Sequence, residues 1–160
     1  LVHRFARNES CDVVVLGSSV FQGLAVDFAE MYPHLRFICL MCRNIPDLPN
    51  LASIDILIYQ ASYVAGIVAA SQEGVQRIGY VASTYSPGAH RDVNAFALGA
   101  QLVRPDAELY LHHVGSWFDP RTERVAGMRM IQQHDVDLLA YDSDSTSIVE
   151  TAKEMGKLSI

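Results

Sequence analysis

Residues 77–114 read RIGYVASTYSPGAHRDVNAFALGAQLVRPDAELYLHHV, and this stretch decides the fold. It begins with a short apolar strand, Arg77 to Ala82, and ends with a second one, Glu108 to Val114. The segment 91–103 between them has apolar residues at helical spacing, and Pro105 follows it. A helix of this length between two such strands predicts a crossover connection within a parallel sheet.

The same alternation extends in both directions along the chain. We predict further strands at 12–16, 36–40, 136–141 and 158–160, and further helices at 21–31, 59–71, 120–134 and 145–155. The run DVVVL at 12–16 is continuously apolar, which predicts a strand buried on both faces. Small residues in the helix 59–71 predict very close packing against a neighbour. The pattern as a whole predicts a doubly wound α/β fold, and the strand at 158–160 leads us to expect that the natural domain continues.

Composition limits the class of protein. At 160 residues the chain has room for one ordinary domain or for parts of two small lobes. Half of the residues are hydrophobic, which fits a packed globular core, and the apolar runs are too short to span a bilayer. A formal net charge of -6 argues against nucleic-acid binding, which needs a basic face. No export signal is visible at the start, which reads Leu-Val-His-Arg.

The sequence offers little for catalysis, metal binding or redox chemistry. Cys39 and Cys42 form a C-x-x-C that closes a strand instead of opening a helix, so we expect plain core thiols. His112 and His113 are adjacent in a strand and point to opposite faces, so they do not form a joint metal site. Neither a G-x-S-x-G elbow nor a nucleotide phosphate fingerprint is present. We therefore expect no enzyme, no metal and no cofactor.

The loop after the strand 108–114 holds the only tryptophan, in Gly115-Ser116-Trp117-Phe118-Asp119-Pro120. Open α/β sheets bind ligands at the carboxyl ends of their strands. Trp117 and Phe118 can form a flat stacking surface there, or they can be ordinary core residues. Asp119 before Pro120 predicts a helix N-cap.

Three other loops follow strands in the same way. Ser18 and Ser19 can donate hydrogen bonds to a ligand or cap the next helix, and Tyr85 can form a second aromatic wall or merely pack. Of Asp142 and Asp144, we expect one to cap the following helix and the other to be free to accept hydrogen bonds from a ligand. Together these loops suit a neutral, flat heteroaromatic ligand that is bound without being transformed.

Several motifs resemble one family in order along the chain. Residues 59–69, YQASYVAGIVA, resemble the helix YQARYLAGIVAG of the basic membrane protein family, the PnrA-like substrate-binding proteins of ABC importers. The resemblance runs from about residue 11 to 160 and includes IGYVA (78–82), NAFALG (94–99), PDAE (105–108) and SWFDP (116–120).

This resemblance implies a type I periplasmic-binding-protein fold with two Rossmann-like lobes, here a partial copy. It implies that residues 1–75 belong to the first lobe and 76–160 to the second. The SWFDP motif is similar to that of the purine-binding branch, so a purine base or nucleoside is the implied ligand, bound between the lobes. Trp117 would stack on the purine and Asp144 would accept its N–H groups. With the loop analysis, the predicted ligand-binding set is Ser18, Ser19, Phe21, Tyr85, Trp117, Phe118 and Asp144.

The implied partners are a small purine ligand and the permease subunits of an ABC importer. The resemblance also implies a lipoprotein anchored at the periplasmic or extracellular face. A partial chain would further need the remainder of its own fold or a dimer partner. Two alternatives stay open: a ligand-sensing domain that works with a signalling domain in a receptor or regulator, and a Rossmann-like enzyme.

Overall fold

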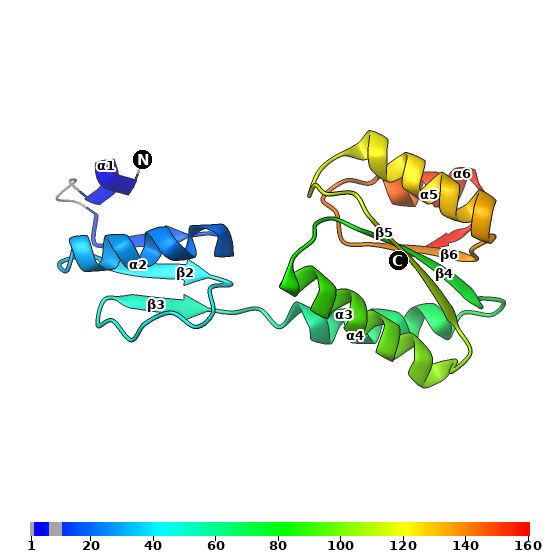
Figure 1. Ribbon diagram of the computed structural model, residues 1–160, viewed down its shortest axis with the longest axis horizontal. Helices are drawn as coiled ribbons and strands as arrows, with labels where there is room; N and C mark the ends of the chain where they lie inside the picture. Colours follow the sequence, from blue (N-terminus) through cyan, green and yellow to red (C-terminus); the bar gives the residue numbers. More distant parts are fainter. Residues whose placement is uncertain (1, 7–10) are drawn as a thin grey trace. The chain divides into compact units, whose positions relative to one another are not determined.

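The computed structural model describes residues 2–6 and 11–160 and divides the chain into two compact units, Leu1–Ile56 and Leu57–Ile160 (Figure 1). Each unit has its own sheet, and every strand pair in both sheets is parallel. The predicted α/β class with parallel sheets is confirmed.

The sheet of the first unit has the strand order β1-β2-β3, formed by β1 (Val13–Leu16), β2 (Arg36–Leu40) and β3 (Leu51–Ile54). The helical elements are α1 (Val2–Ala6), the 3-10 turn η1 (Ser19–Phe21) and α2 (Gln22–Met31). Figure 1 shows α2 lying along one face of this sheet. Ala25, Phe28 and Ala29 of α2 form the core with Val14, Leu16, Phe37, Cys39 and Leu51 of the strands.

The other face of this sheet corrects the prediction that β1 is buried on both sides. Val13 is 42% exposed and Val15 is 58% exposed, whereas their neighbours Val14 and Leu16 are buried. The reason is that α2 packs on the face of Val14 and Leu16 only. The short edge strand β3, in which only Leu51 is buried, was not predicted from the sequence.

The sheet of the second unit has the order β5-β4-β6-β7, formed by β4 (Arg77–Ala82), β5 (Glu108–His113), β6 (Leu138–Tyr141) and β7 (Leu158–Ser159). Its helices are α3 (Ile58–Ala70), α4 (Pro87–Val103), α5 (Pro120–His134) and α6 (Ser147–Glu154). Figure 1 shows α3 and α4 on one face of the sheet and α5 and α6 on the other.

Alternation along the central strand β4 explains these two helical layers. Ile78, Tyr80 and Ala82 pack with α3 and α4 in one core cluster, whereas Val81 packs with α5 and α6 in another. Successive residues of a strand point to opposite faces, so a strand that is apolar throughout must be covered twice. The doubly wound arrangement is therefore confirmed for the second unit.

Helix α3 belongs to the second compact unit, and the lobe boundary after residue 75 stays a prediction. The unit boundary lies between Ile56 and Leu57, because α3 packs directly against α4. A Cβ on Gly66 would lie 2.0 Å from the carbonyl oxygen of Phe96, and a Cβ on Gly99 would lie 2.0 Å from that of Tyr63. The two backbones therefore touch at these glycines, as the small residues of the helix predicted.

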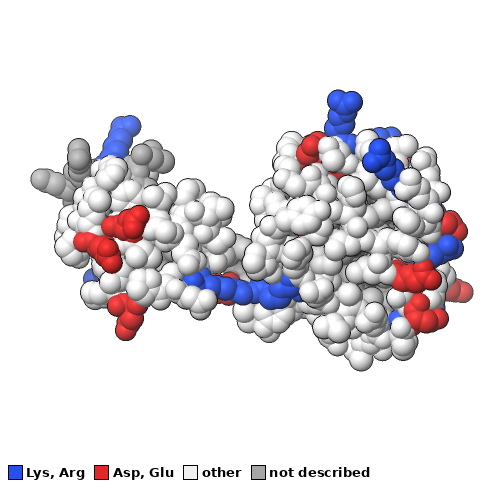
Figure 2. Space-filling model, in the orientation of Figure 1, with Lys and Arg blue, Asp and Glu red and all other residues white. Residues whose placement is uncertain are grey.

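The charge distribution and the length of the helices agree with the expectations from the composition. On the face drawn in Figure 2, Lys and Arg of the second unit are interspersed with Asp and Glu instead of forming one basic patch. Arg77 and Lys157, for example, both pair with Asp135, at 2.8 and 3.3 Å. Over residues 2–6 and 11–160, the structure has no helix with the length and apolar character that a bilayer crossing requires.

Candidate ligand site

Backbone hydrogen bonds join the loops that follow β4, β5 and β6 at the carboxyl edge of the second sheet. Beyond the end of β5, the N–H groups of Val114 and Gly115 donate to the carbonyls of Ala82 and Ser83, at 2.8 and 2.6 Å. The N–H of Asp144 donates to the carbonyl of Trp117 at 2.8 Å. The predicted residues Trp117 and Asp144 are thus held in adjacent, directly bonded loops.

The aromatic pair in the β5–α5 loop is open to solvent. Trp117 is 51% exposed and Phe118 is 63% exposed, so the alternative that they are core residues is wrong. Gly115 has φ +84°, a conformation that suits glycine, at the point where the chain leaves β5. The hydroxyl oxygen of Ser116 accepts from the N–H of Phe118 at 3.2 Å and closes the turn that presents the two rings. Ligand binding by these rings stays a prediction.

Asp119 is the N-cap of α5, as predicted. Its carboxylate accepts from the N–H of Thr122 at 3.1 Å and from the hydroxyl of Thr122 at 2.7 Å, and Pro120 begins the helix. These hydrogen bonds from Thr122 hold the pKa of Asp119 below its ordinary value.

A buried carboxylate that sequence reasoning missed lies behind the aromatic loop. Glu123, in the first turn of α5, is fully buried; its Oε1 accepts from the N–H of Asp119 at 3.0 Å. Its Oε2 accepts from the hydroxyls of Ser145 and Ser147, the latter at 2.7 Å. Burial raises the pKa of Glu123, but the hydrogen bonds from the two serines and Asp119 outweigh burial and lower it.

The two acids after β6 differ from the prediction that one of them caps the next helix. Helix α6 begins at Ser147, and the residue before it, Thr146, makes no side-chain cap. Asp142 instead accepts from the N–H of Ser83 at 2.5 Å, and burial raises the pKa of its carboxyl group. Asp144 is exposed at the edge. Neither acid therefore caps α6, and this helix begins two residues later than predicted.

Tyr85 stacks on a residue that the sequence analysis considered only as a metal ligand. Tyr85 is 73% exposed, and its ring lies 4.1 Å from the ring of His113, centroid to centroid, at 28°. His90 meets His113 edge-on at 5.2 Å. The Nδ1 atom of His113 is buried and has no hydrogen-bond partner among the described residues. Within the part of the chain that is described, no group of three His, Cys, Asp or Glu side chains could hold a metal ion.

A cavity of about 350 Å³ lies between α3 and the sheet, with Tyr80 and Asp142 among its lining residues. Burial first, and then the nearby Asp142, raise the pKa of Tyr80. The cavity contains none of the predicted ligand-binding side chains in its lining. The predicted aromatic surface is thus a feature of the open sheet edge and is distinct from this cavity.

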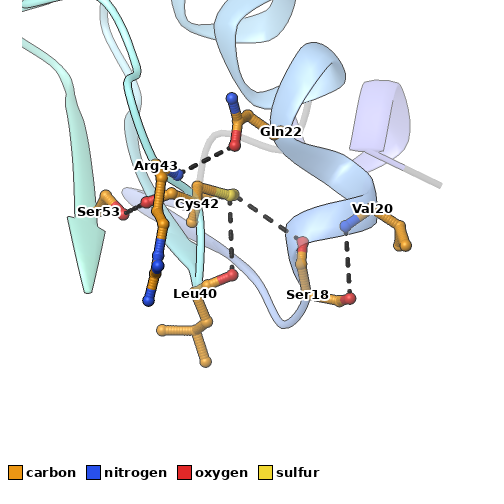
Figure 3. The surroundings of a disulfide bond; sticks show 8 residues. Ser18, Val20, Gln22, Leu40, Cys42, Arg43 and Ser53 are labelled. Carbon is orange, nitrogen blue, oxygen red and sulfur yellow. Dashed lines mark hydrogen bonds between the residues drawn. A yellow bond between two sulfur atoms is a disulfide. The ribbon is translucent and has the colours of Figure 1, made fainter. Parts of the chain in front are cut away.

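The remaining predicted residues lie at the carboxyl end of β1 in the first unit. Ser18 caps η1, since its Oγ accepts from the N–H of Val20 at 3.4 Å, while Ser19 and Phe21 are exposed. Next to this loop, the side-chain oxygen of Gln22 accepts from the N–H of Arg43 at 3.0 Å (Figure 3).

The cysteines beside this loop correct the expectation of plain thiols. Cys39 and Cys42 form a disulfide, with their Cα atoms 5.7 Å apart, and both residues are buried. Cys11 is free and half-buried. The C-x-x-C spacing at the end of β2 therefore closes a small covalent ring next to the loop of Ser18.

Comparison with known proteins identifies the family of this chain. The model of a family described as ABC transporter substrate-binding protein, PnrA-like, matches residues 1–160. A purine-binding protein of Brucella abortus is 32% identical over 131 residues, which is 82% of this chain and 37% of that protein. A protein of Haloferax volcanii, named provisionally as an ABC transporter glucose-binding protein, is 37% identical over 99 residues, 62% of this chain and 25% of that protein.

A solved structure supports the fold. An ABC transporter solute-binding protein of Aeropyrum pernix superposes with a TM-score of 0.85 at 20% identity, covering 99% of this chain and 48% of that one. The chain thus spans about half of that structure and 37% or less of the two sequence relatives. The fold is of the type I periplasmic-binding-protein kind. On the match along its whole length, the chain belongs to the PnrA-like family of ABC transporter substrate-binding proteins.

Proposed function

We propose that this chain binds a purine base and belongs to a protein that delivers the base to an ABC importer. The observation that carries the proposal is the open aromatic surface of Trp117 and Phe118, joined by a backbone hydrogen bond to the loop of Asp144. An exposed aromatic surface beside a carboxylate suits a flat ring that carries N–H donors. The purine-binding relative in Brucella abortus supports this choice of ligand.

Each residue of the site has a distinct proposed role. Trp117 stacks on the purine ring, with Phe118 extending the apolar surface, and Asp144 accepts hydrogen bonds from ring or exocyclic N–H groups. Tyr85 supplies a second aromatic wall from its stack on His113. Ser18, Ser19 and Phe21 of the first unit stay predicted ligand-binding residues. The proposal needs no metal and no covalent step.

Calorimetric titration tests the proposal, with adenine, guanine, xanthine, adenosine and glucose as probes. We expect heat from at least one purine base and an affinity about 5- to 150-fold lower in Trp117→Ala, from the value of base–aromatic stacking. The control is Leu102→Ala, which removes another exposed apolar side chain (64% exposed) near the far end of α4. Leu102→Ala should bind as the unmodified protein does.

Two results would overturn the proposal. One is the absence of heat with every purine probe; the other is unchanged purine affinity in Trp117→Ala. Glucose is included because of the name of the Haloferax volcanii relative and because aromatic rings also stack on sugars. Binding of glucose without any purine would replace the proposed ligand class with a sugar.

The proposed partners are the permease subunits of an ABC importer, reached from outside the cell membrane. Members of the family are extracellular or periplasmic substrate-binding proteins. The disulfide between Cys39 and Cys42 is consistent with an oxidising compartment. We further propose that a lipid anchor holds the protein at the membrane, as the family resemblance implies.

A further inference from the structure

We propose that Glu123 is a positioning residue for the ligand site: its buried carboxylate fixes the Trp117 loop against the Asp144 loop and so sets the spacing between the stacking surface and the hydrogen-bond acceptor. The inference rests on the proposed function for what these loops bind. Glu123 itself contacts neither solvent nor the predicted ligand positions, because it is fully buried behind them.

The first half of this connection holds the end of the aromatic loop. Glu123 lies one turn into α5, and its Oε1 accepts from the N–H of Asp119 at 3.0 Å, while Asp119 itself caps the same helix through Thr122. Asp119, which directly follows Phe118, is therefore held both by its N–H and by its side chain. This fixes the direction in which Trp117 and Phe118 leave the helix start.

The second half holds the loop after β6. Oε2 of Glu123 accepts from the hydroxyls of Ser145, in the loop before α6, and of Ser147, the first residue of α6. The N–H of Ser147 in turn donates to Oγ of Ser145 at 3.2 Å. Asp144 directly precedes this pair, and its N–H reaches the carbonyl of Trp117 at 2.8 Å. The Glu123 carboxylate thus accepts hydrogen bonds from both segments in the interior of the unit, while the backbone bond from Asp144 to Trp117 joins the two loops at the sheet edge.

The chemistry of the network requires an acceptor with several lone pairs. One N–H and two O–H groups converge on this side chain, and an ionised carboxylate accepts from all of them without having to donate. Alanine would remove the acceptor of the Asp119 N–H and leave the two serine hydroxyls, 2.8 Å apart, with only each other as partners, which is costly. Glutamine keeps the shape and one acceptor oxygen, and the serine hydroxyls can rotate to receive its N–H groups.

The test compares Glu123→Ala and Glu123→Gln by quenching the fluorescence of Trp117, the only tryptophan, with acrylamide and without ligand. We expect Glu123→Ala to raise the quenching constant above that of the unmodified protein and Glu123→Gln to restore most of the difference. The control is Glu154→Ala, which removes a surface carboxylate of α6 that pairs with Arg124 of α5. Glu154→Ala also weakens the contact between these two helices, but away from the loops.

Adenine titration provides the second measurement. We expect Glu123→Ala to bind at least about tenfold more weakly, since buried donors lose their partner, and Glu123→Gln to bind closer to the unmodified protein. A folded Glu123→Ala with unchanged quenching and unchanged affinity would overturn the inference. If Glu123→Ala does not fold, the double variant Ser145→Ala/Ser147→Ala takes its place with the same expectations.

The two proposals fail separately. If the unmodified protein binds no purine, the proposed function falls, and the positioning role is judged on quenching alone, which needs no ligand. Unchanged quenching in the folded variant then refutes that role, and increased quenching that Glu123→Gln restores supports it.

Discussion

The contact between α3 and α4 leads to a prediction about Gly99, where two backbones touch. In Gly99→Ala the new Cβ would lie 2.0 Å from the carbonyl oxygen of Tyr63 and 3.2 Å from the N–H nitrogen of Ile67. An ordinary carbon–oxygen contact is about 3.3 Å. The helices must therefore separate by roughly 1.3 Å at this point. Neither atom can rotate away, because both belong to the backbone of α3.

The magnitude follows from two opposing terms. Overpacking typically destabilises by about 1–3 kcal/mol, and a clash between two backbones belongs at the upper end of that range. The higher helix propensity of alanine than of glycine offsets about 1 kcal/mol of this destabilisation. We therefore expect the free energy of unfolding of the second unit to fall by about 2 kcal/mol. Phe96 and Ala100, which pack in the core on either side of Gly99, lose contacts when the helices separate.

The assay is urea denaturation followed by the fluorescence of Trp117, which reports on the second unit because the chain has no other tryptophan. With a slope near 2 kcal/mol per molar, the midpoint should fall by about 1 M. The control is Gly88→Ala in the same helix, where the nearest atom to a new Cβ is 3.8 Å away. Gly88→Ala should stabilise by about 0.5 kcal/mol. A Gly99→Ala variant as stable as Gly88→Ala would refute the close packing of α3 on α4.

Two further predictions concern one variant in each unit. Asp142→Asn should raise the free energy of unfolding at pH 7. Burial raises the pKa of the Asp142 carboxyl group, so its negative charge destabilises the fold above its ordinary pKa. Asparagine removes that charge and can still accept from the N–H of Ser83. Denaturation at several pH values should show the gain shrinking as the pH falls through the raised pKa of the folded state and disappearing below the ordinary pKa. An equal or lower stability at pH 7 would contradict the reasoning. Cys39→Ser/Cys42→Ser should destabilise the first unit by about 2 kcal/mol on the loop-entropy estimate, measured by calorimetry, and should leave the urea midpoint reported by Trp117 unchanged. A shift in that midpoint would be the contrary result.

Much of the second unit follows from periodicity in the sequence. The strand 77–82 and the helix 120–134 have their predicted bounds, because each combines a regular apolar pattern with clear end signals. The cap at Asp119 followed for the same reason. The start of α6 was placed too early, because an aspartate before a helix was read as a cap, whereas Asp142 bonds to another strand end.

The errors in the first unit have a different cause. A continuously apolar strand predicts burial on both faces. Whether a face is covered depends, however, on helices that need not be near in sequence, and Val15 of β1 is exposed to solvent. The strand Leu51–Ile54 was missed because three of its four residues are exposed, so it has no apolar alternation. Small residues in the helix 59–71 predict a close contact but do not name the partner helix.

Within the site, sequence reasoning found the exposed side chains and missed the buried one. Trp117 and Asp144 stand out by residue type and by their position after strands, and their ligand roles remain predictions. Glu123 reads as an ordinary charged residue on a helix, because nothing local shows that Ser145 and Ser147, at the start of the next helix, donate to it. The only available signal was an acid in the first turn of a helix that begins with Asp-Pro.

The hydrogen bond from Asp144 to Trp117 has a consequence for how this family can change its ligand. It joins an amide N–H to a carbonyl oxygen, so it survives any side-chain exchange at 117 and any exchange except proline at 144. Both proposed recognition positions can therefore vary while the backbone contact that holds them stays the same. A library randomised at these two codons should therefore yield folded proteins, and, if the proposed ligand roles hold, some of them should have new selectivities.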